Sequence, residues 1–229
     1  DPDASAEDLR RVICIDPALT GQILKVANSA LFGMMREVST LTHAILTLGF
    51  TTIRSVVIAS SAKTLYQRGG PDLQTRLLWE HALSAALACR ALGERLRLPD
   101  LEEAFIAGLL HDIGKSVLAL RAPARYAALA RTVYNERGAA LDLELEVFGF
   151  DHAMVGEALL DRWHLTADLR AAVRWHHDPL QAPTPHRALT ALVALANQLA
   201  LERTAGLGDP QSLAAATEQA RAILGLDAE

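Results

Sequence analysis

Apolar positions recur along this chain with the period of an α-helix. After Asp16-Pro17, residues Leu19, Ile23, Leu24 and Ala27 follow one another at three- and four-residue spacings, which places them on one helix face. Asp followed by Pro is typical of a helix start, with Asp at the N-cap and Pro in the first turn. No stretch alternates apolar and polar residues with β-branched side chains, as a strand would. The pattern therefore predicts an all-α protein of roughly a dozen helices.

Start and stop signals divide the chain into these helices. Further predicted starts lie at Ser5, Ser39, Thr51 or Thr52, Asp72, Pro99-Asp100, Pro123, Asp151, Thr166, Pro185 and Asp209-Pro210. Gly49 is expected to end one helix, and Gly69-Gly70-Pro71 is the clearest breaker in the sequence. We therefore expect an N-terminal helical subdomain, 1–70, and a second helical subdomain, 71–229.

Composition narrows the class of protein. The 229 residues are 51% hydrophobic, so the chain can bury a full core. Its net charge of −5 argues against nucleic acid or an anionic membrane as a partner. No run of eighteen uncharged apolar residues is present, so no membrane span is expected. The two cysteines, Cys14 and Cys89, lie far apart, which favours a reducing cytoplasm. The chain begins at Asp1 without Met, so we expect it to be part of a longer protein.

Several of the eight histidines occur near predicted helix ends. His111 and Asp112 offer one imidazole and one carboxylate side by side, a pair that suits a divalent transition metal. The following Gly114 is expected to end the helix and let the backbone turn. His152 follows the capping Asp151, the pair His176-His177 closes a helix, and His81 lies within one. Helical proteins build metal sites where such side chains converge.

Each histidine also has an ordinary structural explanation. His81 alone would be a hydrogen-bonded core residue, and His176-His177 could be a C-cap favoured by the helix dipole. We expect His43, His164 and His186 to be surface or half-buried polar residues. The order of the other five histidines along the chain is what favours a common site.

Two segments resemble known families. The run 109–115, LLHDIGK, resembles the signature of the HD superfamily of metal-dependent phosphohydrolases, in particular the HD-GYP cyclic di-GMP phosphodiesterases. The segments 16–19, 23–24, 27–33, 44–45 and 48–49 resemble the N-terminal half of the HDOD domain, a relative of HD hydrolases found in bacterial signalling proteins. Together the resemblances cover most of residues 12–200 and imply a multi-helix HD/HDOD-type fold.

The resemblance implies a set of metal ligands. The family pattern is an upstream helical His, the HD pair, a helix-starting His followed by Gly, a His pair and a final helical Asp. The matching residues here are His81, His111, Asp112, His152 with Gly156, His176, His177 and Asn197. In an enzyme of this type, Asp112 and Lys115 would take part in catalysis. The mainly imidazole ligand set favours zinc, iron, manganese or nickel over magnesium.

Two departures weaken the resemblance to an active enzyme. The Gly-Tyr-Pro motif of HD-GYP enzymes does not follow His176-His177, because the chain continues as DPLQAP. Asn197 stands where the pattern has Asp, and an amide oxygen carries no charge to offset a divalent ion.

Three functions remain open at this point. The preferred one is a bacterial signal-transduction HDOD module, non-catalytic or weakly catalytic, that binds signalling proteins or a nucleotide and retains part of the metal site. The alternative is a metal-dependent phosphohydrolase acting on a nucleotide or cyclic dinucleotide. The third is a helical scaffold whose histidines bind nothing. Metal content and phosphodiester hydrolysis, measured on one sample, would separate them. The sequence leaves open the partner, the upstream signal, any substrate and the oligomeric state.

Overall fold

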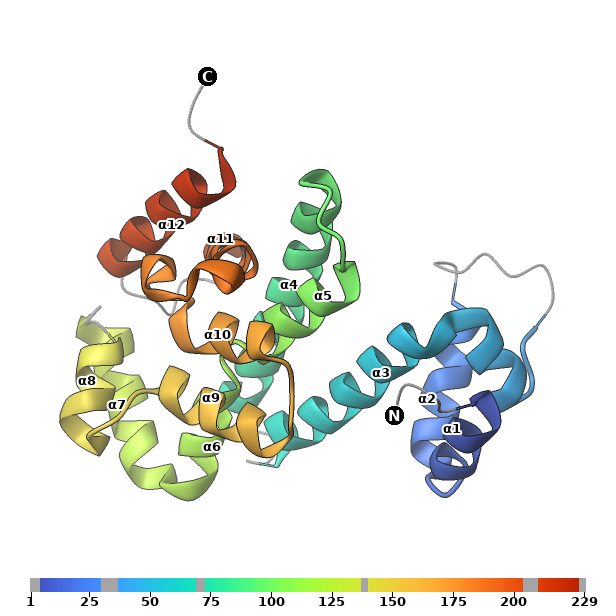
Figure 1. The fold of residues 1–229 in the computed structure, drawn as a ribbon. Helices are drawn as coiled ribbons and strands as arrows, with labels where there is room; N and C mark the ends of the chain where they lie inside the picture. The colour runs from blue at the N-terminus through green and yellow to red at the C-terminus, as the bar shows by residue number, and fades with distance from the viewer. Residues whose placement is uncertain (1–4, 30–36, 69–72, 137–139, 204–209, 227–229) are drawn as a thin grey trace. The chain divides into compact units, whose positions relative to one another are not determined.

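The computed structural model describes residues 5–29, 37–68, 73–136, 140–203 and 210–226. Within these ranges the regular structure is α-helix and short 3-10 helix without any strand (Figure 1), so the all-α prediction is confirmed. Backbone contacts divide the chain into two compact units, Asp1–Ser61 and Ala62–Glu229.

The first unit contains α1 (Ala6–Ile13), α2 (Pro17–Ala27) and the first part of α3 (Leu41–Gln67). The predicted cap Asp16 accepts hydrogen bonds from the backbone N–H groups of Ala18 and Leu19, at 2.9 and 3.0 Å. At the other end of α2, the Asn28 side chain exchanges two hydrogen bonds with the backbone of Val38. A small apolar core holds the unit together, made of Ile13, Ile23, Ala27, Val38, Leu41, Ala44, Ile45, Leu48 and Ile53.

Helix α3 joins two segments that the sequence predicts as separate helices. Gly49 breaks the helical geometry inside it with φ 74° and ψ 163°, a conformation that glycine adopts readily. Thr40, and not the predicted Ser39, precedes the first residue of α3. The Thr40 hydroxyl accepts a hydrogen bond from the backbone N–H of His43 at 3.3 Å. Among the described residues, α3 is long and apolar enough to cross a bilayer, with a mean hydropathy of 1.5 over one window. Only 28% of that apolar stretch is buried, and a single helix of this kind is weak evidence for a membrane span.

The second unit continues from the end of α3 through a set of mostly short helices. They are α4 (Leu73–Arg95), α5 (Leu101–Leu110), α6 (Ile113–Arg121), α7 (Pro123–Glu136), α8 (Ala140–Phe148), α9 (His152–Arg162), α10 (Ala167–Trp175), η2 (Pro179–Gln181), η3 (Thr184–His186), α11 (Arg187–Arg203) and α12 (Pro210–Leu224). The predicted caps Asp100, Asp151 and Thr166 each accept a backbone N–H in the first turn of α5, α9 and α10.

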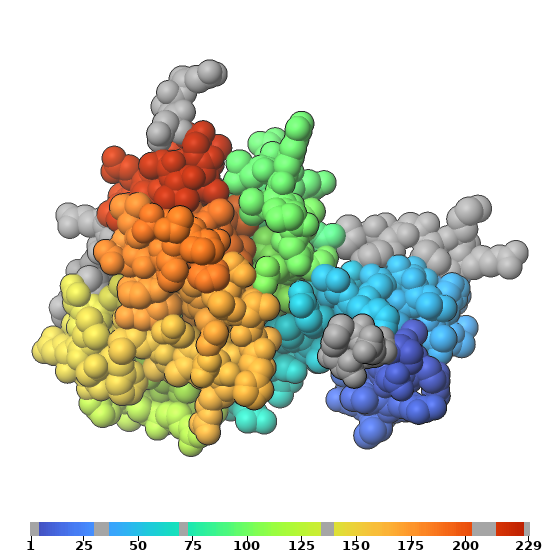
Figure 2. Space-filling view, viewed as in Figure 1, coloured from blue at the N-terminus to red at the C-terminus, as the bar shows by residue number. Residues whose placement is uncertain are grey.

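Packing in the second unit brings distant segments together. Helix α4 packs on α5 and α11, α6 packs on α9, and α9 packs on α10. Figure 2 shows the red surface of α12 against the orange surface of the α10–α11 region, in agreement with the contacts between α11 and α12. Many interface residues are alanines, such as Ala85, Ala86, Ala104 and Ala107, all fully buried. Small side chains let helix axes approach closely, so the ends of α5, α9 and α10 can share one centre.

Some sequence predictions fall outside the described residues. The Gly69-Gly70-Pro71 breaker is among them, so the division into 1–70 and 71–229 stays a prediction. The predicted helix starts at Asp72 and Asp209 also lie outside the described residues, as do residues 30–33 of the segment 27–33 that resembles the HDOD domain.

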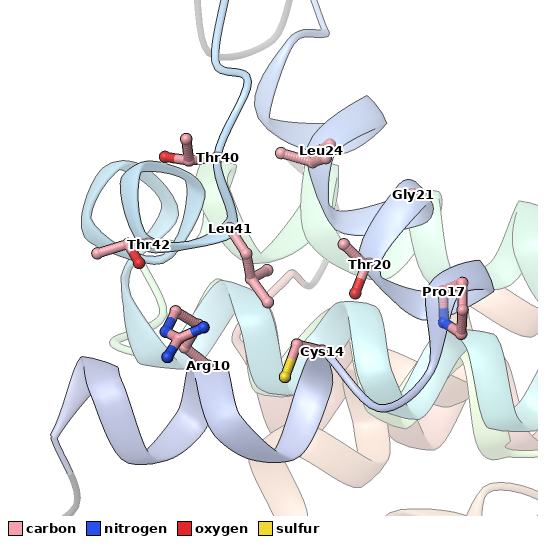
Figure 3. A pocket seen from close by; sticks show the side chains of 9 residues that line it. All are labelled: Arg10, Cys14, Pro17, Thr20, Gly21, Leu24, Thr40, Leu41 and Thr42. Carbon is pink, nitrogen blue, oxygen red and sulfur yellow. The ribbon is translucent and has the colours of Figure 1, made fainter.

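An open cavity of about 640 Å³ lies in the first unit, between α1, α2 and the start of α3 (Figure 3). Its lining mixes apolar residues with threonines, and one guanidinium group, that of Arg10, borders it. It holds no cluster of titratable side chains.

Candidate metal centre

Helix ends and one helix interior supply the side chains of the candidate site. His111 is the C-cap of α5, and Asp112 directly follows as the N-cap of α6. His152 is the first residue of α9, while His176 caps the end of α10 and His177 follows it. His81 comes from the middle of α4. The structure thus brings together six side chains that span 97 positions of sequence (81 to 177).

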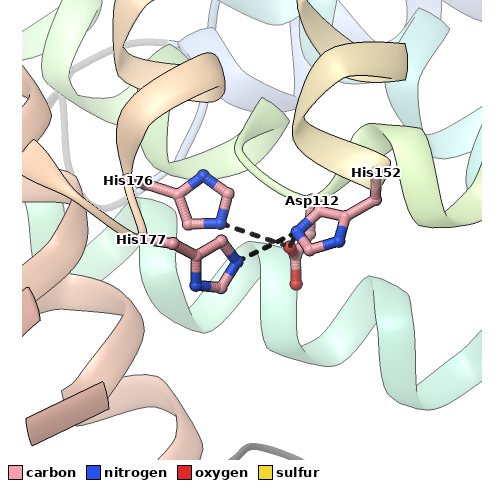
Figure 4. Close-up of side chains that lie close together, drawn as sticks. All are labelled: Asp112, His152, His176 and His177. Atoms are coloured by element: carbon pink, nitrogen blue, oxygen red, sulfur yellow. Dashed lines mark hydrogen bonds and ion pairs between the residues drawn. The ribbon is translucent and has the colours of Figure 1, made fainter. Parts of the chain in front are cut away.

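One group of donor atoms gathers around one oxygen of Asp112. Its Oδ1 lies 3.1 Å from Nε2 of His152 and 3.7 Å from Nε2 of His176. Nε2 of His177 lies 3.1 Å from Nε2 of His152. Figure 4 shows the three imidazole rings directed at the Asp112 carboxylate. Such a set of three imidazoles and one carboxylate within 4.8 Å could hold a metal ion.

A second group shares the same carboxylate through its other oxygen. Oδ2 of Asp112 lies 3.5 Å from Nε2 of His81 and 3.4 Å from Nε2 of His111. The two imidazole nitrogens are 3.2 Å apart. Asp112 therefore links both groups, and all three side chains of the second group are buried.

Hydrogen bonds on the outer side of the rings fix their orientation. Nδ1 of His111 is 2.7 Å from the Gly108 carbonyl, and Nδ1 of His176 is 2.8 Å from the Val173 carbonyl. A carbonyl can only accept, so each Nδ1 carries the proton and donates it. The Nε2 atoms are then the ring nitrogens that face the centre, which is the arrangement typical of metal-ligating histidines.

Several protonation states in the cluster suit a cation; His152 is the exception, because burial and Lys115 lower its pKa but Glu144 and Asp112 outweigh them and raise it above its ordinary value. Burial lowers the pKa of His81 to about 3 and that of His176 to about 4, so both imidazoles are neutral at pH 7. Burial raises the pKa of Asp112, but Lys115 and His111 outweigh it and hold that pKa well below its ordinary value. Neutral imidazoles and an ionised carboxylate are the forms that bind a divalent metal.

Unpaired atoms point to the same conclusion. Among the described residues, Nε2 of His176 and Oδ1 of Asp112 are buried without a hydrogen-bond partner. Leaving such atoms unpaired costs about 1–3 kcal/mol each. A divalent cation would satisfy both, so the residues present fit the metal that the HD pattern implies.

Lys115 and Asn197 lie at the edge of this cluster. Lys115 Nζ is 2.7 Å from Oδ2 of Asp112, and its side chain is 18% exposed, so it could reach a bound anion. Asn197, on α11, is buried and lies close to His81, where it opposes only slightly the lowering of the pKa of that imidazole by burial. Its Oδ1 has no hydrogen-bond partner among the described residues. The structure thus places the residue that replaces the pattern's Asp beside the second group of donors.

The three remaining histidines lie elsewhere, as expected from the sequence. His43 is exposed in the first unit, and His164 is exposed with φ 55° in the loop after α9. His186 pairs with Asp168, 2.7 Å away.

The expectation for Gly114 is wrong. It lies in the first turn of α6 and does not end a helix. A Cβ at this position would lie 1.9 Å from the carbonyl oxygen of His152. Gly114 is therefore required for the close approach of α6 and α9, which the sequence pattern around it does not reveal.

Glu144 is a site residue that the sequence did not single out. It lies on α8 and is 1% exposed. One oxygen, Oε2, lies 2.7 Å from both the backbone N and Nδ1 of His152. Glu144 stands among other acidic residues of an amphipathic helix, and the break between α8 and α9 lies between it and His152, so the two do not share one helix face. Only the fold brings the two together.

Comparison with known proteins places the chain in a family. The HDOD domain model matches residues 1–179. An uncharacterized protein of Treponema pallidum is 27% identical over 200 residues, which cover 86% of this chain and 38% of that protein. The chain thus spans well under half the length of this curated relative.

Solved structures share the fold. An HDOD domain protein of unknown function from Geobacter sulfurreducens matches with a TM-score of 0.79 and 24% identity, over 99% of this chain and 83% of the other. A "Putative phosphohydrolase" from Shewanella amazonensis matches with 0.75 and 27%, over 100% and 81%. A "Putative signal transduction protein" from Marinobacter aquaeolei matches with 0.70 and 23%, over 98% and 53%. With most of its length matched by the family model and its fold shared by these proteins, the chain belongs to the HDOD domain family.

Proposed function

We propose that this chain is a bacterial signal-transduction module that binds a divalent transition metal in its His/Asp cluster and has little or no hydrolytic activity. The carrying observation is the set of buried Asp112, His152 and His176 with half-buried His177, whose donor atoms lie within 4.8 Å of one another. The outward hydrogen bonds at Nδ1 of His111 and His176 support it, because they leave Nε2 free to ligate. Zinc, iron, manganese and nickel suit this ligand set better than magnesium.

The signalling role rests on the family and on what the cluster lacks. Asn197 contributes a neutral amide where a carboxylate would add charge, so the second group of donors holds a cation weakly. A relative of similar fold is described as a signal transduction protein. We propose that the module acts in the cytoplasm on protein partners, with a nucleotide as a further candidate ligand, and without nucleic-acid or membrane binding, in keeping with its net charge of −5.

A metal-dependent phosphohydrolase is the second candidate. Lys115 favours it, because a partly exposed ammonium group beside Asp112 could stabilise phosphate charge. A structural relative is described as a phosphohydrolase. A divalent ion bound here would polarise a phosphoryl oxygen and lower the pKa of a bound water. This chain's residues would hold that ion and orient the phosphate through Lys115.

One preparation tests both candidates. Elemental analysis of the purified chain, and calorimetric titration of metal-stripped protein with zinc and manganese, should show binding. His176→Gln should weaken it, whereas His43→Gln, at an exposed position of the first unit, should not. Hydrolysis of bis(p-nitrophenyl) phosphate and cyclic di-GMP should be near background. Robust hydrolysis by the wild type would favour the metal-dependent phosphohydrolase. Absence of any metal binding would favour the helical scaffold whose histidines bind nothing.

A further inference from the structure

We infer that Glu144 is the positioning residue of the cluster: it accepts the proton of Nδ1 of His152 in a hydrogen bond and thereby keeps Nε2 of that imidazole directed at the metal position. The inference rests on the proposed metal binding for its consequence, but its structural basis is independent of any ion. That basis is the contact of one buried carboxylate oxygen with two nitrogens of the same residue.

The hydrogen-bond geometry defines the tautomer. Oε2 of Glu144 lies 2.7 Å from Nδ1 of His152. The same oxygen accepts the backbone N–H of His152 at 2.7 Å, so it acts as an acceptor towards this residue. Nδ1 of His152 must then carry the proton. His152 is 0% exposed, so no water competes for this proton.

The consequence appears on the other side of the ring. With Nδ1 held by Glu144, Nε2 is the ring nitrogen of His152 that faces the metal position, and this atom lies 3.1 Å from both Oδ1 of Asp112 and Nε2 of His177. His111 and His176 obtain the same tautomer from neutral carbonyls. Among these three rings, His152 is the one oriented by a charged acceptor, and a carboxylate partner makes an imidazole the stronger ligand.

The same oxygen also anchors the helix that carries His152. His152 is the first residue of α9, so its backbone N–H has no partner within the helix. Glu144 accepts this N–H at 2.7 Å, while Asp151 accepts the N–H of Met154. A negative charge at a helix N-terminus is favourable. Backbone and ring of His152 are thus held by one atom, which leaves the side chain little freedom to turn away.

The experiment compares three variants of the full chain, with folding checked by circular dichroism. Glu144→Met removes the acceptor, Glu144→Gln keeps an acceptor oxygen but removes the charge, and Glu146→Gln is the matched control at an exposed position of the same helix. The first readout is the ¹⁵N spectrum of the histidine rings in metal-stripped protein. The wild type, Glu146→Gln and Glu144→Gln should show His152 protonated at Nδ1, and Glu144→Met should lose this signature.

The second readout is zinc affinity by calorimetry. Loss of an outer partner of a ligating histidine costs about 10- to 100-fold in metal affinity, so Glu144→Met should fall in this range and Glu144→Gln should be weakened less. An unchanged tautomer in folded Glu144→Met would overturn the inference. If Glu144→Met does not fold, wild-type zinc affinity in Glu144→Gln would overturn it. A wild type that binds no zinc would refute the proposed function, while the tautomer readout would still decide the role of Glu144.

Discussion

At the scale of single residues, the histidines of the cluster differ from the other histidines of the chain in their burial and in their hydrogen bonds. His176 is 1% exposed with a pKa lowered by burial to about 4, whereas His43 is exposed. Burial keeps the ring neutral, and the carbonyl of Val173 fixes which nitrogen faces the centre. Residue type alone therefore says little about ligation, because both histidines have the same intrinsic chemistry.

Asn197→Asp should strengthen metal binding. The change restores an anionic oxygen beside His81 at nearly the same volume, and about 1.4 kcal/mol of added attraction would raise affinity tenfold. Titration of metal-stripped wild type and variant with manganese and zinc at fixed pH measures the gain. Gln181→Glu is the control, since it adds the same charge at an exposed position. Equal affinities in wild type and Asn197→Asp would mean that position 197 does not act on the metal.

The two thiols should differ sharply in reactivity. Cys14 is exposed, whereas Cys89 is buried, and burial raises the pKa of its thiol. The thiolate is the reactive form, so a thiol reagent such as DTNB should modify one cysteine per native chain and the second only after unfolding. Cys14→Ser should abolish the fast reaction. Two fast thiols in the native wild type would contradict the buried position of Cys89.

At the scale of helices, the site depends on how closely α6 and α9 approach. The missing side chain of Gly114 makes room for the His152 carbonyl, and Gly156 faces Val173 in the same way, with a Cβ position 2.6 Å from its Cγ1. Two glycines thus let α9 pack tightly against α6 on one side and α10 on another. The consequence is that Asp112, His152 and His176 can share one centre.

Gly114→Ala should destabilise the second unit and weaken metal binding together. The new methyl group would collide with backbone, so the helices must separate, at a cost of about 1–3 kcal/mol or more. Urea unfolding followed by tryptophan fluorescence and zinc titration measure the two effects. Gly21→Ala is the control, because nothing lies within 4 Å of its Cβ position in α2; it should leave zinc affinity and the unfolding seen by tryptophan fluorescence at the wild-type values, since α2 lies in the first unit and all three tryptophans lie in the second. If Gly114→Ala had the same free energy of unfolding as the wild type, the contact between α6 and α9 would have space for a methyl group, contrary to this prediction.

At the scale of the whole molecule, the described cluster belongs to one of the two compact units. All its residues fall within Ala62–Glu229, and so do the three tryptophans of the chain, Trp79, Trp163 and Trp175. The first unit has its own apolar core, built around Ile23, Ile45 and Ile53. Tryptophan fluorescence therefore reports on the unit that carries the site.

Zinc should raise the thermal unfolding temperature seen by tryptophan fluorescence. A ligand that binds only the folded state at 100 times its Kd adds about 2.7 kcal/mol, and each kcal/mol is worth roughly 2–4 °C for a chain of this size. EDTA should reverse the rise, and magnesium at the same concentration should produce little. His43→Gln should retain the effect and His176→Gln should lose it. If zinc left the unfolding temperature of the wild type unchanged, this would contradict a metal site in this unit.

The sequence by itself determined the helical class and many helix starts. Asp16, Asp100, Asp151 and Thr166 cap the helices predicted from them, because capping is a local hydrogen bond between neighbouring residues. The order of the histidines and the HDIGK run also indicated which side chains to examine. Local pattern and resemblance were enough for the helix caps and the candidate site residues, since both depend only on short stretches of sequence.

Only the tertiary structure decided how these residues meet. Glu144 contacts His152 across the short connection 149–151 between α8 and α9, and helical spacing does not extend across that break. Gly114 serves a contact between helices, so its local context suggested a helix end where the structure has a helix start. Asn197 comes beside His81 through the packing of α11 on α4. The physical reason is common to all three: contacts between helices depend on packing and direction in space, which residue spacing along one helix does not encode.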